Sequence, residues 1–246
     1  ELKGLKINCL GDSITEGCGA TDFAEKGYVG LLKNKYGAIT RNYGIGGTRL
    51  AKQKTPSLYP RHDLDFCSRF AEMDDDADLV LVFGGTNDFG HGDAEIGTFE
   101  DRTPDTFYGA LHTLYKGLVE KYPCSKIVVL TPLHRLEEQR GGKFLKNYVN
   151  IIREVAEYYS LPVLDLYASA GVNPIIPIEH FLEETNVVDI VKENMEVGLF
   201  VNCSNLYSIL LGCYRFVIGY SDLWPQGTIE ELGIDSQEFL SFVSSF

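Results

Sequence analysis

Three short segments that combine glycine with serine or asparagine constrain the fold of this chain most, because each follows a run of apolar residues. The first, G-D-S-I-T at residues 11–15, follows the alternating run at 5–10. The second, N-Y-G-I-G-G-T at 42–48, and the third, G-G-T-N-D at 84–88, also follow apolar segments. Such runs predict buried strands, and in open α/β folds ligands bind beyond the carboxyl ends of the strands. We therefore expect the three segments to share one edge of a parallel sheet.

The rest of the pattern agrees with that expectation, because strand-like and helix-like segments alternate. Strands are predicted near residues 5–10, 38–43, 78–83, 126–131 and 162–166. Helices are predicted near residues 27–36, 104–121 and 144–160. The two longer helices carry apolar residues at three- and four-residue spacing, which is typical of a face buried against a sheet. Alternation of this kind predicts an α/β protein in three layers, α/β/α, with a parallel sheet. We expect one domain over residues 1–246.

The residue types in these turns point to nucleophilic chemistry. A hydroxyl at Ser13, lifted from the sheet edge, is a candidate nucleophile, while glycine lets a backbone N–H approach a ligand and an asparagine amide supplies a second donor. Together these are the parts of a nucleophile with an oxyanion hole. Taken singly, each segment also has a simpler interpretation. Asp12 and Ser13 suit a capped turn, and each glycine segment suits a tight connection between strand and helix.

The order of these three motifs, G-D-S-I-T, then N-x-G-x-x-G, then G-G-T-N-D, resembles that of the GDSL, or SGNH, hydrolase family. The resemblance covers roughly residues 5–175. T-N-D-F-G-H-G-D is similar to bacterial lipase and acylhydrolase members. The resemblance implies a flavodoxin-like fold and hydrolysis of a carboxylic ester through an acyl-enzyme on Ser13. It also implies that Gly47 and Asn87 stabilise the oxyanion, with the backbone N–H of Ser13. The resemblance favours Gly47 over its neighbours because it stands five residues after Asn42, as the family's oxyanion glycine does. No cofactor or metal is implied.

The general base is the open point, because the family's Asp-x-x-His motif does not follow the last predicted strand. Chain order, nucleophile first and base last, favours His180. His91 completes an Asp-x-x-His within the third segment, and His134 follows a strand, so each is a candidate for a relocated base. His62 suits a solvated loop, and His112 suits a surface or packing role inside a helix.

The chain is atypical from about residue 178, and Trp224 stands where a family member would have the base. Three explanations remain open: a relocated base, a silent protein that keeps a binding cleft, or an altered sequence in this part of the chain. An indole N–H only donates hydrogen bonds, so Trp224 cannot take the proton of a serine.

Further residues are expected to line the substrate pocket. Asp12 is interpreted as a hydrogen-bonding residue beside the nucleophile rather than the acid of a triad, and His91 and His134 as parts of the cleft. Phe89 suits either an apolar wall or the core. The site chemistry suits small acyl esters, acetylated sugars or lipid esters equally, so the substrate remains open.

Composition excludes several other classes of function. A formal net charge of −13 argues against nucleic-acid binding, which depends on clustered Lys and Arg. Six cysteines without a C-x-x-C pair argue against a zinc site. Residues 44–47 lack the G-x-G-x-x-G pattern of a dinucleotide site. We expect no membrane span and a cytoplasmic protein, although a removed leader stays open, as does the oligomeric state.

Overall fold

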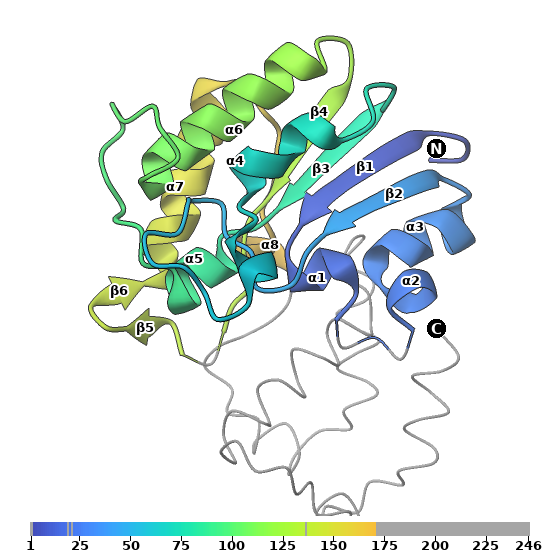
Figure 1. Cartoon of the computed structure of the whole chain (residues 1–246). Helices are drawn as coiled ribbons and strands as arrows, with labels where there is room; N and C mark the ends of the chain where they lie inside the picture. Colours follow the sequence, from blue (N-terminus) through green and yellow to red (C-terminus); the bar gives the residue numbers. More distant parts are fainter. Residues whose placement is uncertain (1, 19, 21, 136, 171–246) are drawn as a thin grey trace, which may run out of the picture.

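The structure, a computed structural model, describes residues 2–18, 20, 22–135 and 137–170 (Figure 1). Within these residues the central sheet is fully parallel, with strand order β2-β1-β3-β4-β7. Its strands are β1 (Lys6–Gly11), β2 (Ile39–Gly44), β3 (Leu79–Phe83), β4 (Lys126–Leu130) and β7 (Val163–Leu164). Counted along the chain, this order is 2-1-3-4-5, which is that of flavodoxin-like folds. The predicted fold class is confirmed.

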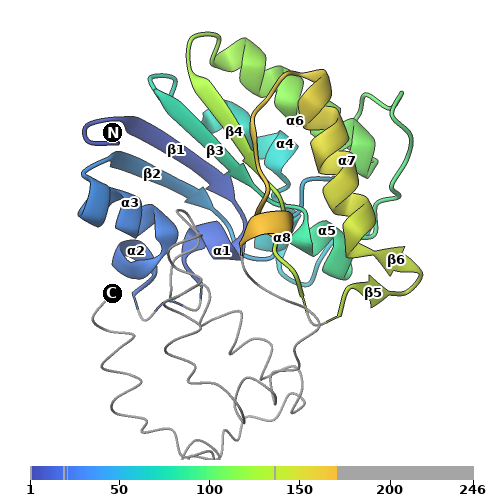
Figure 2. The same cartoon turned by 180° about the vertical axis from the view of Figure 1, so that it is seen from behind.

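Helices cover both faces of this sheet. The α-helices are α1 (Ser13–Glu16), α2 (Phe23–Lys26), α3 (Tyr28–Tyr36), α4 (Phe66–Arg69), α5 (Thr86–His91), α6 (Phe107–Lys121), α7 (Leu145–Tyr158) and α8 (Leu166–Ser169). Two 3-10 turns, η1 (Pro60–Asp63) and η2 (Phe70–Glu72), flank α4, and an antiparallel hairpin joins β5 (Gln139–Arg140) to β6 (Lys143–Phe144). Figures 1 and 2 show α6 and α7 on one side of the sheet and α3 on the other.

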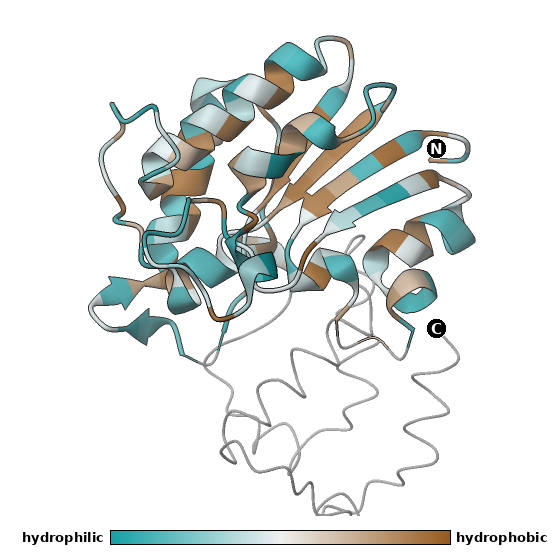
Figure 3. Ribbon diagram, in the orientation of Figure 1, coloured by the Kyte–Doolittle hydropathy of each residue, from teal (hydrophilic) through white to brown (hydrophobic). Residues whose placement is uncertain are grey.

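Alternation along the strands divides the core between these two faces. In β1, Leu10 packs with α6 and α7, whereas Ile7 and Cys9 pack with α3. In β3, Val80 and Val82 face the first layer, and Leu79, Leu81 and Phe83 face the second. Figure 3 shows the apolar colour concentrated on β1, β3 and β4, while the edge strand β2 is more polar. A parallel sheet covered on both faces requires this continuous apolar character in its central strands.

The long elements lie where the sequence predicts them. The observed strands begin within one residue of the predicted starts, and α3, α6 and α7 each begin one to three residues inside the predicted range. The short helices α1, α2, α4, α5 and α8 and the β5–β6 hairpin were not predicted. They are too short to show a hydrophobic period. An aspartate side chain caps the start of α1, α2, α4 and α8, whereas α5 has no side-chain cap.

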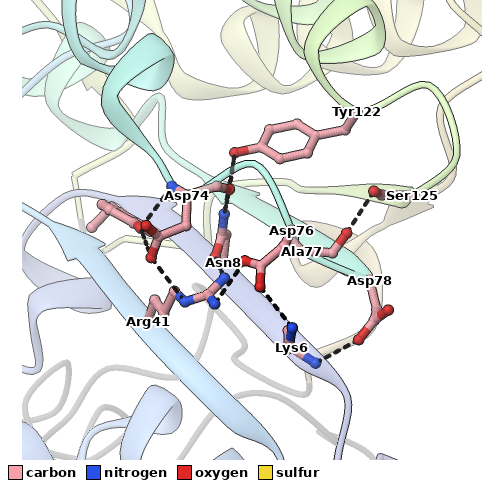
Figure 4. Close-up of polar contacts among 10 residues, drawn as sticks. Lys6, Asn8, Arg41, Asp74, Asp76, Ala77, Asp78, Tyr122 and Ser125 are labelled. Carbon is pink, nitrogen blue, oxygen red and sulfur yellow. Dashed lines mark hydrogen bonds and ion pairs between the residues drawn. The ribbon is translucent and has the colours of Figure 1, made fainter.

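Charged side chains tie together the amino ends of the strands (Figure 4). Lys6 Nζ lies 2.6 Å from Asp76 Oδ2, and Arg41 Nη2 lies 2.7 Å from Asp76 Oδ1. Arg41 Nε also pairs with Asp74 Oδ2 at 2.9 Å. The buried Asn8 donates through Nδ2 to the carbonyl of Asp74 at 2.8 Å and to Tyr122 Oη at 3.1 Å. This network fastens the loop before β3 to β1 and β2.

None of the helices in the described part of the chain combines the length and the apolar composition that crossing a membrane requires.

Candidate active site

The first turn places Ser13 at the carboxyl end of β1, where it becomes the first residue of α1. The Asp12 side chain caps this helix, because its Oδ1 accepts the N–H of Ile14 at 3.0 Å. Ser13 itself is half-buried, and its own N–H belongs to the first turn, where backbone donors have no acceptor within the helix. This segment is therefore a capped turn, and the same turn presents a serine at the sheet edge.

The second turn lies directly beside Ser13. The carbonyl of Ile45 accepts the N–H of Thr48 at 3.3 Å, which closes a tight turn with Gly46 and Gly47 at its centre. A Cβ added to Gly46 would lie 3.6 Å from the Cβ of Ser13, so this turn and the nucleophile candidate are neighbours. Gly47 has a φ of 76°, a conformation that favours glycine. The imidazole ring of His62 packs against Gly47, since a Cβ there would lie 2.7 Å from His62 Cδ2.

One carboxylate decides which of the two glycine N–H groups is occupied. Glu16 Oε2 accepts the N–H of Gly46 at 2.6 Å, and Glu16 also pairs with Arg61. Within the described residues, the N–H of Gly47 has no acceptor. Among the described residues, the turn therefore presents the N–H of Gly47, and not that of Gly46, as an unoccupied donor.

The third turn brings Asn87 to the same place. Its Nδ2 donates to the carbonyl of Thr48 at 2.9 Å, which joins α5 to the glycine turn. The next residue, Asp88, is buried and accepts the N–H groups of Leu50 at 3.0 Å and Ala51 at 2.9 Å. The structure thus brings Ser13, Gly47 and Asn87 together, and Figures 1 and 2 show α1 and α5 along the same edge of the sheet.

His91, at the end of α5, has both ring nitrogens engaged. Its Nδ1 lies 2.8 Å from Arg49 Nη1, and its Nε2 lies 3.2 Å from Asn87 Oδ1. Burial, followed by the charge of Arg49, lowers the pKa of His91 to about 4, so its ring is neutral at neutral pH. In this arrangement neither nitrogen is available to take a proton from Ser13.

Buried charges lie under the site. Burial raises the pKa of Asp12 to about 7 and that of Asp88 to about 6, against the hydrogen bonds that each accepts from the backbone. Arg69 is also buried, and burial lowers its pKa to about 10. It donates to the carbonyl of Gly11 at 2.7 Å and to that of Tyr43, so one guanidinium joins the carboxyl ends of β1 and β2.

The remaining predicted residues lie apart from this cluster or outside the described residues. The structure places Phe89 in the core, 1 % exposed and edge-on to Tyr148, so the packing interpretation applies. His134 Nδ1 lies 2.6 Å from Glu138 Oε1, and its ring lies against Tyr167. His112 is buried among aromatic side chains, so the packing role applies rather than the surface role. His180 and Trp224 lie outside the described residues. In the described ranges, no group of three His, Cys, Asp or Glu side chains is arranged to hold a metal ion.

Four residues of the site were missed from the sequence: Glu16, Arg49, His62 and Arg69. His62 was interpreted as a solvated loop residue, whereas the structure places it half-buried against Gly47. Arg49 and Arg69 are 3 % and 9 % exposed. The one local signal is that Arg49 follows the glycine turn directly, in G-G-T-R.

The comparison with protein families shows to which family this chain belongs. The family model described as GDSL-like lipase/acylhydrolase matches residues 9–182, which is most of the chain. The chain belongs to the GDSL-like lipase/acylhydrolase family. It is therefore a hydrolase of carboxylic esters, and a serine nucleophile and an oxyanion hole are features of its family. No curated protein matches the chain.

Solved structures share the fold of this chain. A Lactobacillus plantarum protein is 26 % identical with a TM-score of 0.63, over 80 % of this chain and 96 % of its own. A protein of Bacteroides uniformis assigned to the GDSL-like lipases is 19 % identical, with a TM-score of 0.52, over 65 % of this chain and 82 % of its own. A possible lipase of Chitinophaga pinensis is 19 % identical, with a TM-score of 0.50, over 88 % of this chain and 100 % of its own. At such identities, the last two comparisons concern the fold alone.

Proposed function

We propose that this hydrolase cleaves its ester through an acyl-enzyme on Ser13. The observation that carries the proposal is the convergence of three strand ends, with Gly46 against Ser13 and Asn87 hydrogen-bonded to Thr48. The Ser13 hydroxyl attacks the ester carbonyl, the alcohol leaves, and water then releases the acid from Ser13. Both steps pass through a tetrahedral oxyanion, which needs donors placed in advance.

Three donors are assigned to that oxyanion: the N–H of Ser13, the N–H of Gly47 and one N–H of the Asn87 amide. Each belongs to a different strand end, so the sheet itself sets their spacing. The Gly46 N–H is not among them, because Glu16 already accepts it. Hydrogen-bond donors fixed in this way require little reorganisation when the charge develops.

We assign the general base to His180, on chain order alone. A serine hydroxyl becomes an effective nucleophile only when an adjacent base takes its proton. His91 is already bound on both nitrogens, which supports a base elsewhere. The His180→Ala variant is expected to lose most of its turnover and to recover part of it when imidazole is added to the assay. Unchanged turnover in this variant would remove the assignment.

The decisive experiment measures hydrolysis of p-nitrophenyl acetate, butyrate and octanoate by the full chain. The Ser13→Ala variant is expected to lose roughly 10⁴- to 10⁶-fold in kcat. Ser125→Ala is the matched control, because its hydroxyl donates to the carbonyl of Ala77 at the opposite end of the sheet (Figure 4). Activity that survives Ser13→Ala would refute the acyl-enzyme. Absence of any hydrolysis, including of acetylated sugars, would favour the silent binding protein. The ranking of the three chain lengths separates small acyl from lipid esters.

A further inference from the structure

A chain of hydrogen bonds runs from Arg49 through His91 to Asn87. The chemistry of the groups determines which is the donor and which the acceptor in each bond. A guanidinium only donates, so His91 Nδ1 accepts from Arg49 Nη1 over 2.8 Å. A neutral imidazole then carries its proton on Nε2, which donates to Asn87 Oδ1 over 3.2 Å. At the far end, the carbonyl of Thr48 only accepts, so the Asn87 group that faces it, at 2.9 Å, is the Nδ2 amide.

These contacts fix the Asn87 amide at both ends. Its oxygen is held by His91, and one of its two N–H bonds is held by Thr48. The second N–H of Nδ2 is the group left for the oxyanion. In the other tautomer, the Nδ1–H of His91 would face a donor of Arg49, and the unprotonated Nε2 would face the acceptor Oδ1 of Asn87. The orientation of the Asn87 amide therefore depends on the tautomer of His91.

The surroundings of His91 keep its ring neutral. The Arg49 side chain is 3 % exposed and also donates to the carbonyl of His62 at 2.9 Å and to Asp63 at 3.3 Å. The charged and titratable groups that face His91 are Arg49, His62, Arg135 and Arg140, and all four disfavour its protonation. Burial acts in the same direction, and the pKa of His91 falls to about 4.

We propose that Arg49 and His91 are positioning residues of the oxyanion hole, which hold the Asn87 amide with one N–H directed at the reacting carbonyl. This inference rests on the proposed function, and it gives His91 a role that is neither general base nor wall of the pocket. Hydrogen bonds in series also polarise one another, so the charge of Arg49 makes the free amide N–H a stronger donor.

A double-mutant cycle tests the proposal with hydrolysis of p-nitrophenyl acetate. His91→Leu is expected to lower kcat about 5- to 10-fold with little change in KM, since one hydrogen bond to the amide is lost. His91→Gln should recover most of that loss, because its amide can accept from Arg49 and donate to Asn87. In an Asn87→Ala background, His91→Leu should have no further effect. A side chain that merely packs, or that touches the substrate, would give independent effects, and such additivity would overturn the proposal.

Nitrogen NMR of the histidine rings provides a readout that needs no catalysis. At neutral pH, His91 is expected as the Nε2–H tautomer with an unprotonated Nδ1, and to titrate near pH 4 rather than at the ordinary 6.5. The Nδ1–H tautomer, or an ordinary titration, would overturn the proposal. Activity that survives Ser13→Ala would refute the proposed function instead, and the NMR result would still decide the state of His91.

Discussion

The two ends of the parallel sheet use charged residues in opposite ways. At the amino ends, Lys6 and Arg41 pair with Asp74 and Asp76 on the surface, with the two aspartate side chains 59 % and 55 % exposed (Figure 4). At the carboxyl ends, the charges of Asp12, Asp88, Arg49 and Arg69 are buried. The main partners of Asp12, Asp88 and Arg69 are backbone groups, whereas Arg49 bonds to the carbonyl of His62, to Asp63 and to His91.

This difference shows what each end contributes. Exposed ion pairs are weak and screened by salt, so the amino end fastens the loop before β3 without fixing any one geometry. Buried charges bonded to the backbone fix geometry at a cost in desolvation. Asp88 holds the N–H groups of Leu50 and Ala51, and Arg69 holds the carbonyl of Gly11. Burying these charges at the carboxyl end lowers stability, and the same buried groups hold in place the turns that carry the site.

Among the substitutions that compare the two ends of the sheet, Asn87→Ala at the carboxyl end is expected to have the largest effect. Removing one donor of an oxyanion hole lowers kcat by about 10²- to 10³-fold, while KM changes little. Steady-state hydrolysis of p-nitrophenyl acetate measures both. A loss below threefold would remove Asn87 from the proposed oxyanion hole.

The matched substitution at the amino end, Asn8→Ala, should leave kcat unchanged and lower stability. Asn8 is 0 % exposed and donates to the carbonyl of Asp74 and to Tyr122 Oη. The substitution removes a buried amide and both of these hydrogen bonds, each of which contributes about 0.5–1.5 kcal/mol to the free energy of unfolding. Urea denaturation measures the cost. If kcat fell as well, the two ends of the sheet would not be separable.

The two ends should also respond to pH with opposite signs. The folded-state pKa of Asp12, about 7, lies above its unfolded value of 3.8, so the folded state binds more protons between these pH values. Stability contributed by this group therefore falls as pH rises through that window. Asp12→Asn keeps an oxygen to cap α1, and its stability relative to the parent protein should increase from about pH 4 to pH 7. Urea denaturation of both proteins across this pH range tests the prediction. A difference in the free energy of unfolding that stays constant with pH would contradict it.

The smallest effect is expected for Asp76→Asn. The hydrogen bond from Lys6, with that from Arg41, lowers the pKa of Asp76 below 3.8, so its contribution to stability is present above that value and is lost as pH falls through it. At neutral pH the variant should melt slightly earlier than the parent. The difference should vanish in roughly 1 M salt, where the Debye length is about 3 Å. A difference that persists in salt would mean that the pair is not simply a surface interaction.

The sequence predicts the elements whose pattern is long enough to repeat. The strands before the three turns and the apolar stripes of α6 and α7 follow from periodicity, and the residues at the turns follow from the order of the motifs. Arg49, Arg69 and His62 could not be predicted in this way. Their roles come from contacts across the fold, such as that of His62 with Gly47, and no local spacing encodes them. For the same reason, the sequence showed His91 as an Asp-x-x-His candidate but not its bond to Arg49.

The loop between the glycine turn and α4 is anchored on both sides of its tip. Asp93 accepts the N–H groups of Lys54 and Thr55, at 2.8 and 2.7 Å, and Arg61 pairs with Glu16. Between these anchors Leu58 and Tyr59 are 94 % and 66 % exposed. An exposed loop tip tolerates insertion. Residues added between Leu58 and Tyr59 would thus extend the protein beside the ring of His62, while the two anchors of the loop, at Asp93 and at Glu16, lie on either side of the insertion.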